Sequence, residues 1–275
     1  MISFVGAGPG SPDLLTLRGA RRLADADVAV WASSLVPAEV LAHCRADVEL
    51  HDSAGMTLED VLAVYAAHPD ARITRLHSGD VSVYSSITEQ IAWCVQQERA
   101  FEIVPGVGSL AAAAATAGVE LTVPGVAQSV VLTRLGGGRT AASMPAGESV
   151  AEFATHGTTM AVYLSAARPG QLREELLAGY PGDTPAIVVA KASWPDQTVI
   201  TTTVDGLPGA LGASGIRTAA LVLVGPALRA AGEVVGEVAV QRSRLYDPAY
   251  SHGCRRRSFE GSTTGRPIPI GKRRV

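Results

Sequence analysis

The chain has 275 residues, enough for two domains of ordinary size, with 47% hydrophobic residues and a formal net charge of −3. It shows no uncharged apolar run of the roughly 20 residues that span a membrane, no signal-peptide pattern and only three scattered cysteines, so we expect a cytoplasmic protein without a membrane partner. The residues before Cys254 carry 16 basic and 25 acidic side chains, and this acidic body argues against a nucleic-acid partner.

The first half of the chain alternates short β-branched runs with amphipathic segments, which is the pattern of parallel strands joined by crossover helices. The expected strands cover residues 2–6, 27–31, 48–50, 72–76 and 101–104. The expected helices cover residues 17–24, 38–43, 57–67, 87–97 and 110–117. In the third of them, Thr57 is followed three residues later by Asp60, as at a capped helix start. We therefore predict an N-terminal α/β domain over residues 1–121.

The glycines and prolines of the stretch 118–125 mark the expected domain boundary. The runs that follow are rich in Val, Ile and Thr and predict a C-terminal α+β domain, residues 122–252, with a mixed sheet. Its expected strands cover residues 129–134, 159–165, 186–193, 198–204 and 219–225, and residues 136–149 are expected to form a mobile loop over a cleft. Residues 253–275 are basic and predict a disordered tail.

The first glycine-rich loop, "VGAGPGSPD", has Gly6, Gly8 and Gly10 directly after a strand. A dinucleotide fingerprint needs its third glycine where Ser11 stands, and a carboxylate at the end of the second strand, which is absent. A nicotinamide oxidoreductase is therefore a weak alternative. The loop suits a small adenosyl-type ligand, and a tight turn without any ligand remains open.

Two further loops with glycines follow expected strands. One contains Gly79 and Asp80, whose carboxylate could bind a ligand or cap a helix, and the other contains Gly106 and Gly108. Ligands collect outside the carboxyl ends of parallel strands, so three such loops indicate a shared site. An enzyme and a non-catalytic nucleotide-binding module both remain compatible with these loops.

Taken together, these loops resemble those of the tetrapyrrole methylase family, the S-adenosylmethionine-dependent enzymes of corrin and sirohaem synthesis. "VGAGPGSPDLLTLRG" at 5–19 resembles the family's opening "VGAGPGDPxLLTxxG", with Ser11 in place of its usual Asp. Gly79-Asp80 resembles its "GD" loop and "PGVGS" at 105–109 its "PGVS" turn. The later blocks that resemble the family are "AVYLS" at 161–165, "KASWPDQ" at 191–197 and "AALVLVG" at 219–225. The resemblance covers about residues 2–252 and implies a two-domain tetrapyrrole methylase fold with its active site in the cleft between the domains.

Two blocks resemble the subgroup that methylates precorrin-4 at C11, namely "WASSLVP" at 31–37 and "SRLYDPAYSH" at 243–252. Gly253-Cys254-Arg255 follows the second block, so the aromatic residue usual there is missing while the arginine is kept. The resemblance implies methylation of precorrin-4 at C11 to give precorrin-5, and a homodimer. The alternatives are the cobalt-loaded macrocycle, another ring carbon and, with less support, a relative that acts on ribosomal RNA or diphthamide.

The resemblance also implies which residues bind the donor, S-adenosylmethionine, and release S-adenosylhomocysteine. The expected donor contacts are Pro9, Gly79, Asp80, Val83, Gly108, Ser109, Leu164, Ala192, Thr218 and Ala219. The macrocycle carries many carboxylates, so cations and tyrosines are expected along its trough. The candidates are Arg75, Tyr84, Arg134, Arg139, Arg168 and Tyr246.

The chemistry requires few reactive side chains. Because the sulfonium leaves as a neutral thioether, no acid is needed, and positioning alone can contribute up to about 7 to 11 kcal/mol. No catalytic residue is assigned. His77 is expected to be structural more than a proton shuttle, and His43-Cys44 lacks partner ligands, so we predict no metal site.

Overall fold

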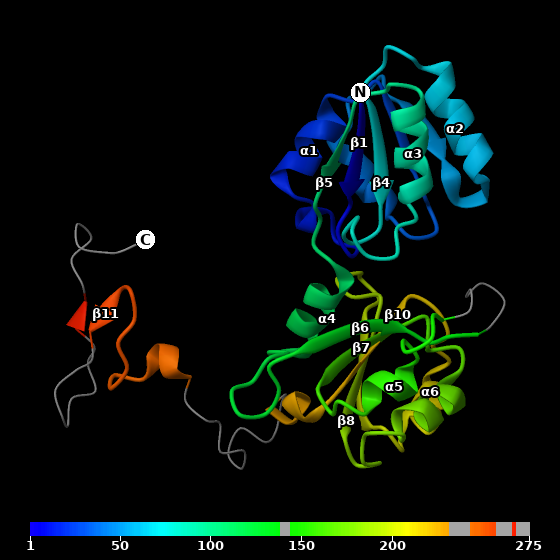
Figure 1. The fold of residues 1–275 in the computed structure, drawn as a ribbon. Coiled ribbons are helices and arrows are strands. Elements are labelled where there is room, and N and C mark those ends of the chain that lie inside the picture. The colour runs from blue at the N-terminus through cyan, green and yellow to red at the C-terminus, as the bar shows by residue number, and fades with distance from the viewer. Residues whose placement is uncertain (138–143, 231–242, 257–265, 268–275) are drawn as a thin grey trace.

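The computed structural model describes residues 1–137, 144–230, 243–256 and 266–267, and most of them form the two lobes seen in Figure 1. The first lobe is built on a five-stranded sheet with the order β3-β2-β4-β1-β5, and all its strand pairs are parallel. The strands are β1 Ile2–Gly6, β2 Val28–Trp31, β3 Glu49–Asp52, β4 Ile73–His77 and β5 Phe101–Val104. The parallel N-terminal sheet predicted from the sequence is confirmed.

Helices cover both faces of this sheet because neighbouring residues of a strand point to opposite sides. Phe4 packs into a core with Val61 of α2 and Cys94 of α3, whereas Val5 packs with Leu23 of α1 on the other face. The helices are α1 Leu17–Ala24, α2 Leu58–Ala67 and α3 Thr88–Gln96. The expected helix at residues 38–43 is the 3-10 helix η2 Ala38–His43, whose turn is closed by the i→i+3 bonds of a 3-10 geometry.

The second lobe contains a mixed five-stranded sheet with the order β6-β7-β10-β8-β9. Strands β6 and β7 are parallel, while β10 is antiparallel to both β7 and β8, and β8 is antiparallel to β9. The strands are β6 Val130–Arg134, β7 Thr159–Tyr163, β8 Pro185–Ala190, β9 Thr198–Thr203 and β10 Ala220–Val224. The predicted mixed sheet is confirmed, with every expected strand present to within three residues at each end.

The second sheet is also covered on two faces. Helices α5 Val150–Ala154, α6 Pro169–Leu176 and α7 Leu207–Ser214 contribute to one large core. Helix α4 Ser109–Ala117 packs on the other face, where Ala112 and Ala113 meet Ile187 and Leu223. The predicted first domain includes this helix, but its apolar side is buried by the second sheet. The domain boundary at residues 121 and 122 stays a prediction.

The remaining described segments are short. They are the 3-10 helices η1 Pro12–Leu14, η3 Ser53–Gly55, η4 Pro226–Ala230 and η5 Arg244–Tyr246, and the paired strands β11 Arg255–Arg256 and β12 Arg266–Pro267. Of the expected loop at residues 136–149, the part 138–143 lies outside the described residues, as does most of the tail. Among the described residues, no helix combines the length and apolar character needed to cross a bilayer.

The start of α2 offers a test of a local sequence signal. The Thr57 hydroxyl accepts a hydrogen bond from the Asp60 N–H at 3.2 Å, and the Asp60 carboxylate accepts one from the Thr57 N–H at 2.9 Å. Thr57→Ala is expected to lower the free energy of unfolding by about 1 kcal/mol, measured by urea denaturation, because the Asp60 N–H loses its acceptor. Thr57→Ser keeps the hydroxyl and serves as the control, and an Ala variant as stable as the Ser variant would contradict the cap.

Candidate active site

The three glycine-bearing loops meet at the carboxyl ends of β1, β4 and β5. Gly8 and Gly79 pair through their backbones, with N···O distances of 3.2 and 2.7 Å in the two directions. A Cβ atom on Gly6 would lie 2.7 Å from both the Gly106 Cα and the Gly79 carbonyl oxygen. No side chain fits between these loops, so the glycines allow three backbones to touch.

Asp80 holds two of these loops together. Its Oδ2 accepts a hydrogen bond from the Gly106 N–H at 2.8 Å, and its Oδ1 accepts one from the Ser82 N–H at 2.9 Å and another from the Ser82 hydroxyl. Burial acts to raise the pKa of Asp80, but these hydrogen bonds from Ser82 and Gly106 outweigh it and lower the pKa below its ordinary value. The carboxylate is therefore ionised at neutral pH and pins the loop after β4 to the loop after β5.

The facing edge of the second lobe is built from strained backbone. Leu164 after β7, Lys191 after β8 and Ala219 before β10 have φ angles of 52°, 48° and 51°, a left-handed conformation that is uncommon for residues other than glycine. The Lys191 N–H donates to the Ala219 carbonyl at 2.8 Å, which ties two of them together. Each such residue costs about 1 to 3 kcal/mol, and such strain clusters at ligand sites. The edge is therefore a candidate ligand-binding surface.

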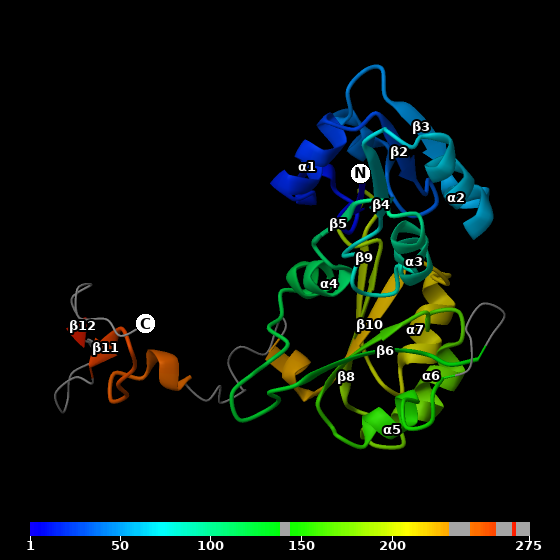
Figure 2. The ribbon, with the colours of Figure 1, turned by 45° about the horizontal axis from the view of Figure 1, so that its top comes forward.

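Two sets of side chains join this edge to the first lobe. The Ser109 hydroxyl at the start of α4 donates to the Tyr163 hydroxyl at 3.2 Å, and the Tyr163 ring meets the Tyr84 ring edge-on at a centroid distance of 5.1 Å. The Trp194 indole N–H donates to the Pro9 carbonyl at 2.9 Å. The loops of the first lobe thus meet the strand ends of the second, as Figure 2 shows from its tilted view.

A cavity of about 420 Å³ lies beside the Trp194 contact. Its volume falls within the range of small-molecule sites. The cavity is lined from the first lobe by Gly10, Ser11, Pro12, Pro37 and Glu39, and from the second by Lys191, Ser193, Trp194, Pro195 and Asp196. Both lobes therefore contribute to a hollow next to the first glycine loop.

The structure brings most of the predicted donor-binding residues to this junction. Pro9 and Gly79 are buried in the paired loops, and Gly108 lies next to Asp80, since a Cβ on Gly108 would be 3.7 Å from the Asp80 Cβ. Val83 is half-buried in the turn that follows Asp80. On the second lobe Leu164, Thr218 and Ala219 are exposed at strand ends, and Ala192 packs among the residues that cover α4.

The predicted macrocycle-binding residues are more scattered. Arg134 ends β6 in register with Tyr163, and Tyr84 is 51% exposed against that same tyrosine. The Arg75 guanidinium donates to the Ser53 hydroxyl at 2.7 Å, and burial lowers the pKa of this arginine. Arg134 and Tyr84 therefore lie near Tyr163 at the junction, whereas Arg75 lies in the middle of β4 with its guanidinium largely buried.

The other three candidates lie elsewhere. Arg168 donates to the Gly136 carbonyl at 2.6 Å and to the Leu135 carbonyl at 3.3 Å, so its guanidinium holds the loop after β6. Tyr246 is 73% exposed in η5, which lies apart from both lobes in Figures 1 and 2. Arg139 lies outside the described residues.

His77 ends β4 but is buried. Burial, together with the nearby Arg75 charge, lowers the pKa of His77 to about 3, so the imidazole is neutral at physiological pH. This environment supports the structural role expected for it. A cationic His77 is thus absent from the junction at neutral pH.

Tyr163 and Trp194 are two junction residues that no sequence pattern marked as functional. Both stand in blocks that carry the family resemblance, "AVYLS" and "KASWPDQ", but no local pattern says which partner they meet 54 and 185 residues away. The signal available for Trp194 was its position as a bulky aromatic residue in a short loop, between small residues and a proline.

The chain is similar to known proteins in both sequence and structure. Residues 1–208 match the family model of the Tetrapyrrole (Corrin/Porphyrin) Methylases. A precorrin-4 C(11)-methyltransferase of a Sinorhizobium species is 40% identical over 93% of this chain and 98% of its own length. The structure of a cobalt precorrin-4 methyltransferase matches with a TM-score of 0.79 and 40% identity, over 82% of this chain and 95% of that one. A uroporphyrin-III C-methyltransferase of Thermus thermophilus, solved with S-adenosyl homocysteine, matches with a TM-score of 0.68 and 28% identity over 83% and 98%.

Proposed function

Because this chain belongs to the tetrapyrrole methylase family, we propose that it transfers a methyl group from S-adenosylmethionine to C11 of precorrin-4, giving precorrin-5. The observation that carries the proposal is the 40% identity to a precorrin-4 C(11)-methyltransferase over nearly the whole length of both chains. Identity of this extent includes both lobes and the junction between them, so it reaches beyond the shared fold. The chain is therefore an enzyme of the methyltransferase class.

The donor is proposed to bind at the junction, against the glycine loops and the strained strand ends. Gly79 and Gly108 present backbone groups without side chains, while Leu164 and Ala219 turn their peptide groups through left-handed conformations. The adenosyl group of this donor is uncharged, and it needs shape and a few backbone hydrogen bonds more than charged partners. This surface fits such a ligand, and the full set of proposed donor contacts is the one that the resemblance implies.

The chain's part in the reaction is proposed to be positioning. The bond between the methyl carbon and sulfur breaks as a bond to the ring carbon forms, S-adenosylhomocysteine leaves without charge, and the ring then loses a proton or rearranges. An in-line displacement of this kind gains mainly from holding three atoms in line. The rigid contacts of Asp80 and Trp194 are suited to that task, and no residue is assigned as an acid or base.

The macrocycle is proposed to bind on the open side of the donor, where its carboxylates can meet cations. Arg134 and Tyr84 are the candidates closest to the junction, and Arg75 is kept as a candidate two residues before the end of β4. Arg168 is assigned instead to positioning the loop after β6, since its donors are engaged by backbone carbonyls. We further propose that the protein is cytoplasmic and forms a homodimer. Size-exclusion chromatography with light scattering would test the homodimer by its mass in solution.

One assay tests the reaction and its closest alternative. The protein is incubated with S-adenosylmethionine and either precorrin-4 or cobalt-precorrin-4, and each product is examined by mass spectrometry for one added methyl group. Carbon-13 in the donor methyl then locates the new bond by NMR. A gain at C11 of precorrin-4 supports the proposal, a gain only with the cobalt form selects the alternative named by the cobalt precorrin-4 match, and a methyl at another ring carbon contradicts both.

Binding measurements separate the methyltransferase from a nucleotide-dependent oxidoreductase. Calorimetry is expected to show binding of S-adenosylhomocysteine and none of NADH, since the first glycine loop lacks the third glycine of a dinucleotide site. The reverse result would remove the proposal.

Asp80 provides a test of the donor site. Asp80→Ala releases the loop after β5 from the loop after β4, and we expect the affinity for S-adenosylhomocysteine to fall at least about 5-fold, measured by calorimetry, because a hydrogen bond to a charged group contributes about 1.5 to 3 kcal/mol. Asp80→Asn, which keeps one acceptor oxygen, should lose less. Asp70→Ala removes an exposed carboxylate far from the loops and is the matched control.

The pH dependence of this loop follows from the direction of the Asp80 shift. Because the folded protein lowers the pKa of Asp80, its contribution is complete above the ordinary value of about 3.9 and is lost only as the pH falls through the lower folded value. Donor affinity should therefore not change between pH 5 and pH 8 on account of Asp80. An affinity step in that interval that Asp80→Asn removes would contradict the assignment.

A further inference from the structure

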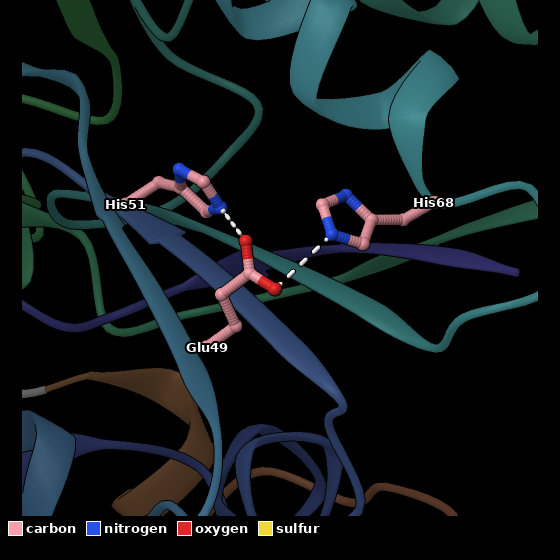
Figure 3. Close-up of side chains that lie close together, drawn as sticks. All are labelled: Glu49, His51 and His68. Atoms are coloured by element: carbon pink, nitrogen blue, oxygen red, sulfur yellow. Dashed lines mark hydrogen bonds and ion pairs between the residues drawn. The ribbon is translucent and has the colours of Figure 1, made fainter.

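A cluster of two histidines and a glutamate, Glu49, His51 and His68, lies on the first lobe (Figure 3). Glu49 and His51 are two residues apart on β3 and therefore point to the same side of that strand. His68 is the C-cap residue of α2. The His51 Nε2 lies 2.7 Å from Glu49 Oε1, and the His68 Nε2 lies 3.1 Å from Glu49 Oε2.

The hydrogen bonding of His68 is informative about what this cluster binds. Its Nδ1 lies 2.8 Å from the Val64 carbonyl oxygen, which can only accept, so Nδ1 carries the proton. In the neutral imidazole the Nε2 then has a lone pair, and this lone pair faces the Glu49 carboxylate, another acceptor. The His68 Nε2 and the Glu49 carboxylate therefore point into the same space, together with the His51 Nε2 on the other carboxylate oxygen.

We infer that Glu49, His51 and His68 bind a divalent transition-metal ion, with Zn²⁺ as the representative of that class. Two imidazoles and one carboxylate form the ligand set of many zinc sites, with the fourth position open to water. Ligand atoms about 2.0 to 2.2 Å from a tetrahedral metal lie about 3.3 Å apart. The His68 to Glu49 contact is close to that separation, and all three ligand atoms lie within 4.8 Å of one another.

The surroundings of His68 resemble those of a metal ligand. A carbonyl partner on the second ring nitrogen fixes the tautomer and orients the ring, as it does for most metal-binding histidines. The Arg99 guanidinium donates to the His68 carbonyl at 2.8 Å and to the Ala71 carbonyl at 2.7 Å, so the backbone that carries the ligand is held. The nitrogen ligands favour zinc, cobalt, nickel or copper ions over magnesium or calcium.

The site is separate from the proposed methyl transfer. Glu49 pairs with Val28 and lies at the start of its strand, whereas the glycine loops follow the strand ends. Strand β3 is also at the edge of the sheet, bonded only to β2 among the described strands. A metal bound here would join this edge strand to the end of α2, and so would stabilise the first lobe without contacting the donor.

Metal titration of the intact chain tests the inference. The protein is prepared without a histidine tag, stripped with EDTA and titrated with ZnCl₂ by calorimetry in the absence of any tetrapyrrole. We expect one Zn²⁺ per chain with a Kd in the micromolar range or tighter, a melting temperature that rises with free Zn²⁺, and visible absorption bands of four-coordinate cobalt when Co²⁺ replaces it. His51→Gln and His68→Gln should each weaken binding at least 10-fold.

His43→Gln is the matched control, since His43 is an exposed histidine next to Cys44 and lies outside the cluster. Its Zn²⁺ affinity should equal that of the wild type. If the wild type takes up no Zn²⁺, a protonated His68 explains the contact and the inference is wrong. Binding that survives His68→Gln, or that His43→Gln removes, would overturn it as well.

Discussion

Gly106→Ala is expected to abolish measurable binding of S-adenosylhomocysteine and to lower the free energy of unfolding by about 1 to 3 kcal/mol. A Cβ on Gly106 would lie 2.8 Å from the Gly6 Cα and closer still to the Gly79 carbonyl oxygen. All the obstructing atoms belong to the backbone, so no side chain can rotate out of the way. The loop after β4 must therefore move, and the Gly8 and Gly79 pair with it.

The control for this substitution is Gly209→Ala. Gly209 lies inside α7, and a Cβ there would meet nothing within 4 Å. Alanine is the better helix former by about 1 kcal/mol, so this variant should be at least as stable as the wild type and bind the donor product normally. Calorimetry and urea denaturation of both variants give the comparison. Normal binding by Gly106→Ala would mean that the loops can separate without harm and that the donor does not depend on their contact.

Trp194→Ala is expected to lower kcat/KM for the tetrapyrrole about 100-fold, while the variant remains folded. The Trp194 indole bonds to Pro9 across the junction, and its ring occupies the space beside Gly10, where a Cβ would lie 3.0 Å from Trp194 Cγ. Losing the ring removes the packing of Trp194 against the first glycine loop, so the two lobes can shift relative to each other. A displacement of the reacting groups of about 1 Å can cost 100-fold in rate. Steady-state kinetics at saturating donor measure the effect.

Two further variants locate its cause. Trp194→Phe keeps most of the packing but not the N–H, and should fall between the wild type and the alanine variant. Asp183→Asn breaks an exposed ion pair with Arg229 before the start of β8, at the end of that strand away from Lys191. The pair is worth at most about 1 kcal/mol, so this variant should change kcat/KM little. Equal losses for Asp183→Asn and Trp194→Ala would show that the indole has no special part in the rate.

The fold was largely predictable because its strands are marked by β-branched runs and its turns by glycine and proline. The parallel and mixed character of the two sheets followed from the spacing of those runs. The partner of α4 was not predictable, since a helix of alanines has no strongly apolar stripe to show which sheet it covers. Its buried alanines pack against the second sheet because the connections before and after the helix place it there.

The candidate site was predictable in its loops and not in its cross-lobe contacts. Gly79, Asp80 and Gly108 follow strands, and strand ends gather at one edge by topology. By contrast, the engagement of Arg168 with Gly136 and Leu135 depends on the path of a loop. The cluster of Glu49, His51 and His68 unites a strand and a helix end, and only the alternation of Glu49 and His51 was visible in the sequence.

The order of strands in the second sheet bears on how the chain folds during synthesis. Strand β10 is the last of the five strands of this sheet in sequence, yet it lies between β7 and β8. While the ribosome is still translating residues before 220, β7 and β8 have no neighbour on their inner edges, whereas every strand of the first sheet is complete by residue 104. Nascent chains stalled between these points should therefore contain a protease-resistant first lobe and a second half that is still open to cleavage and to chaperones.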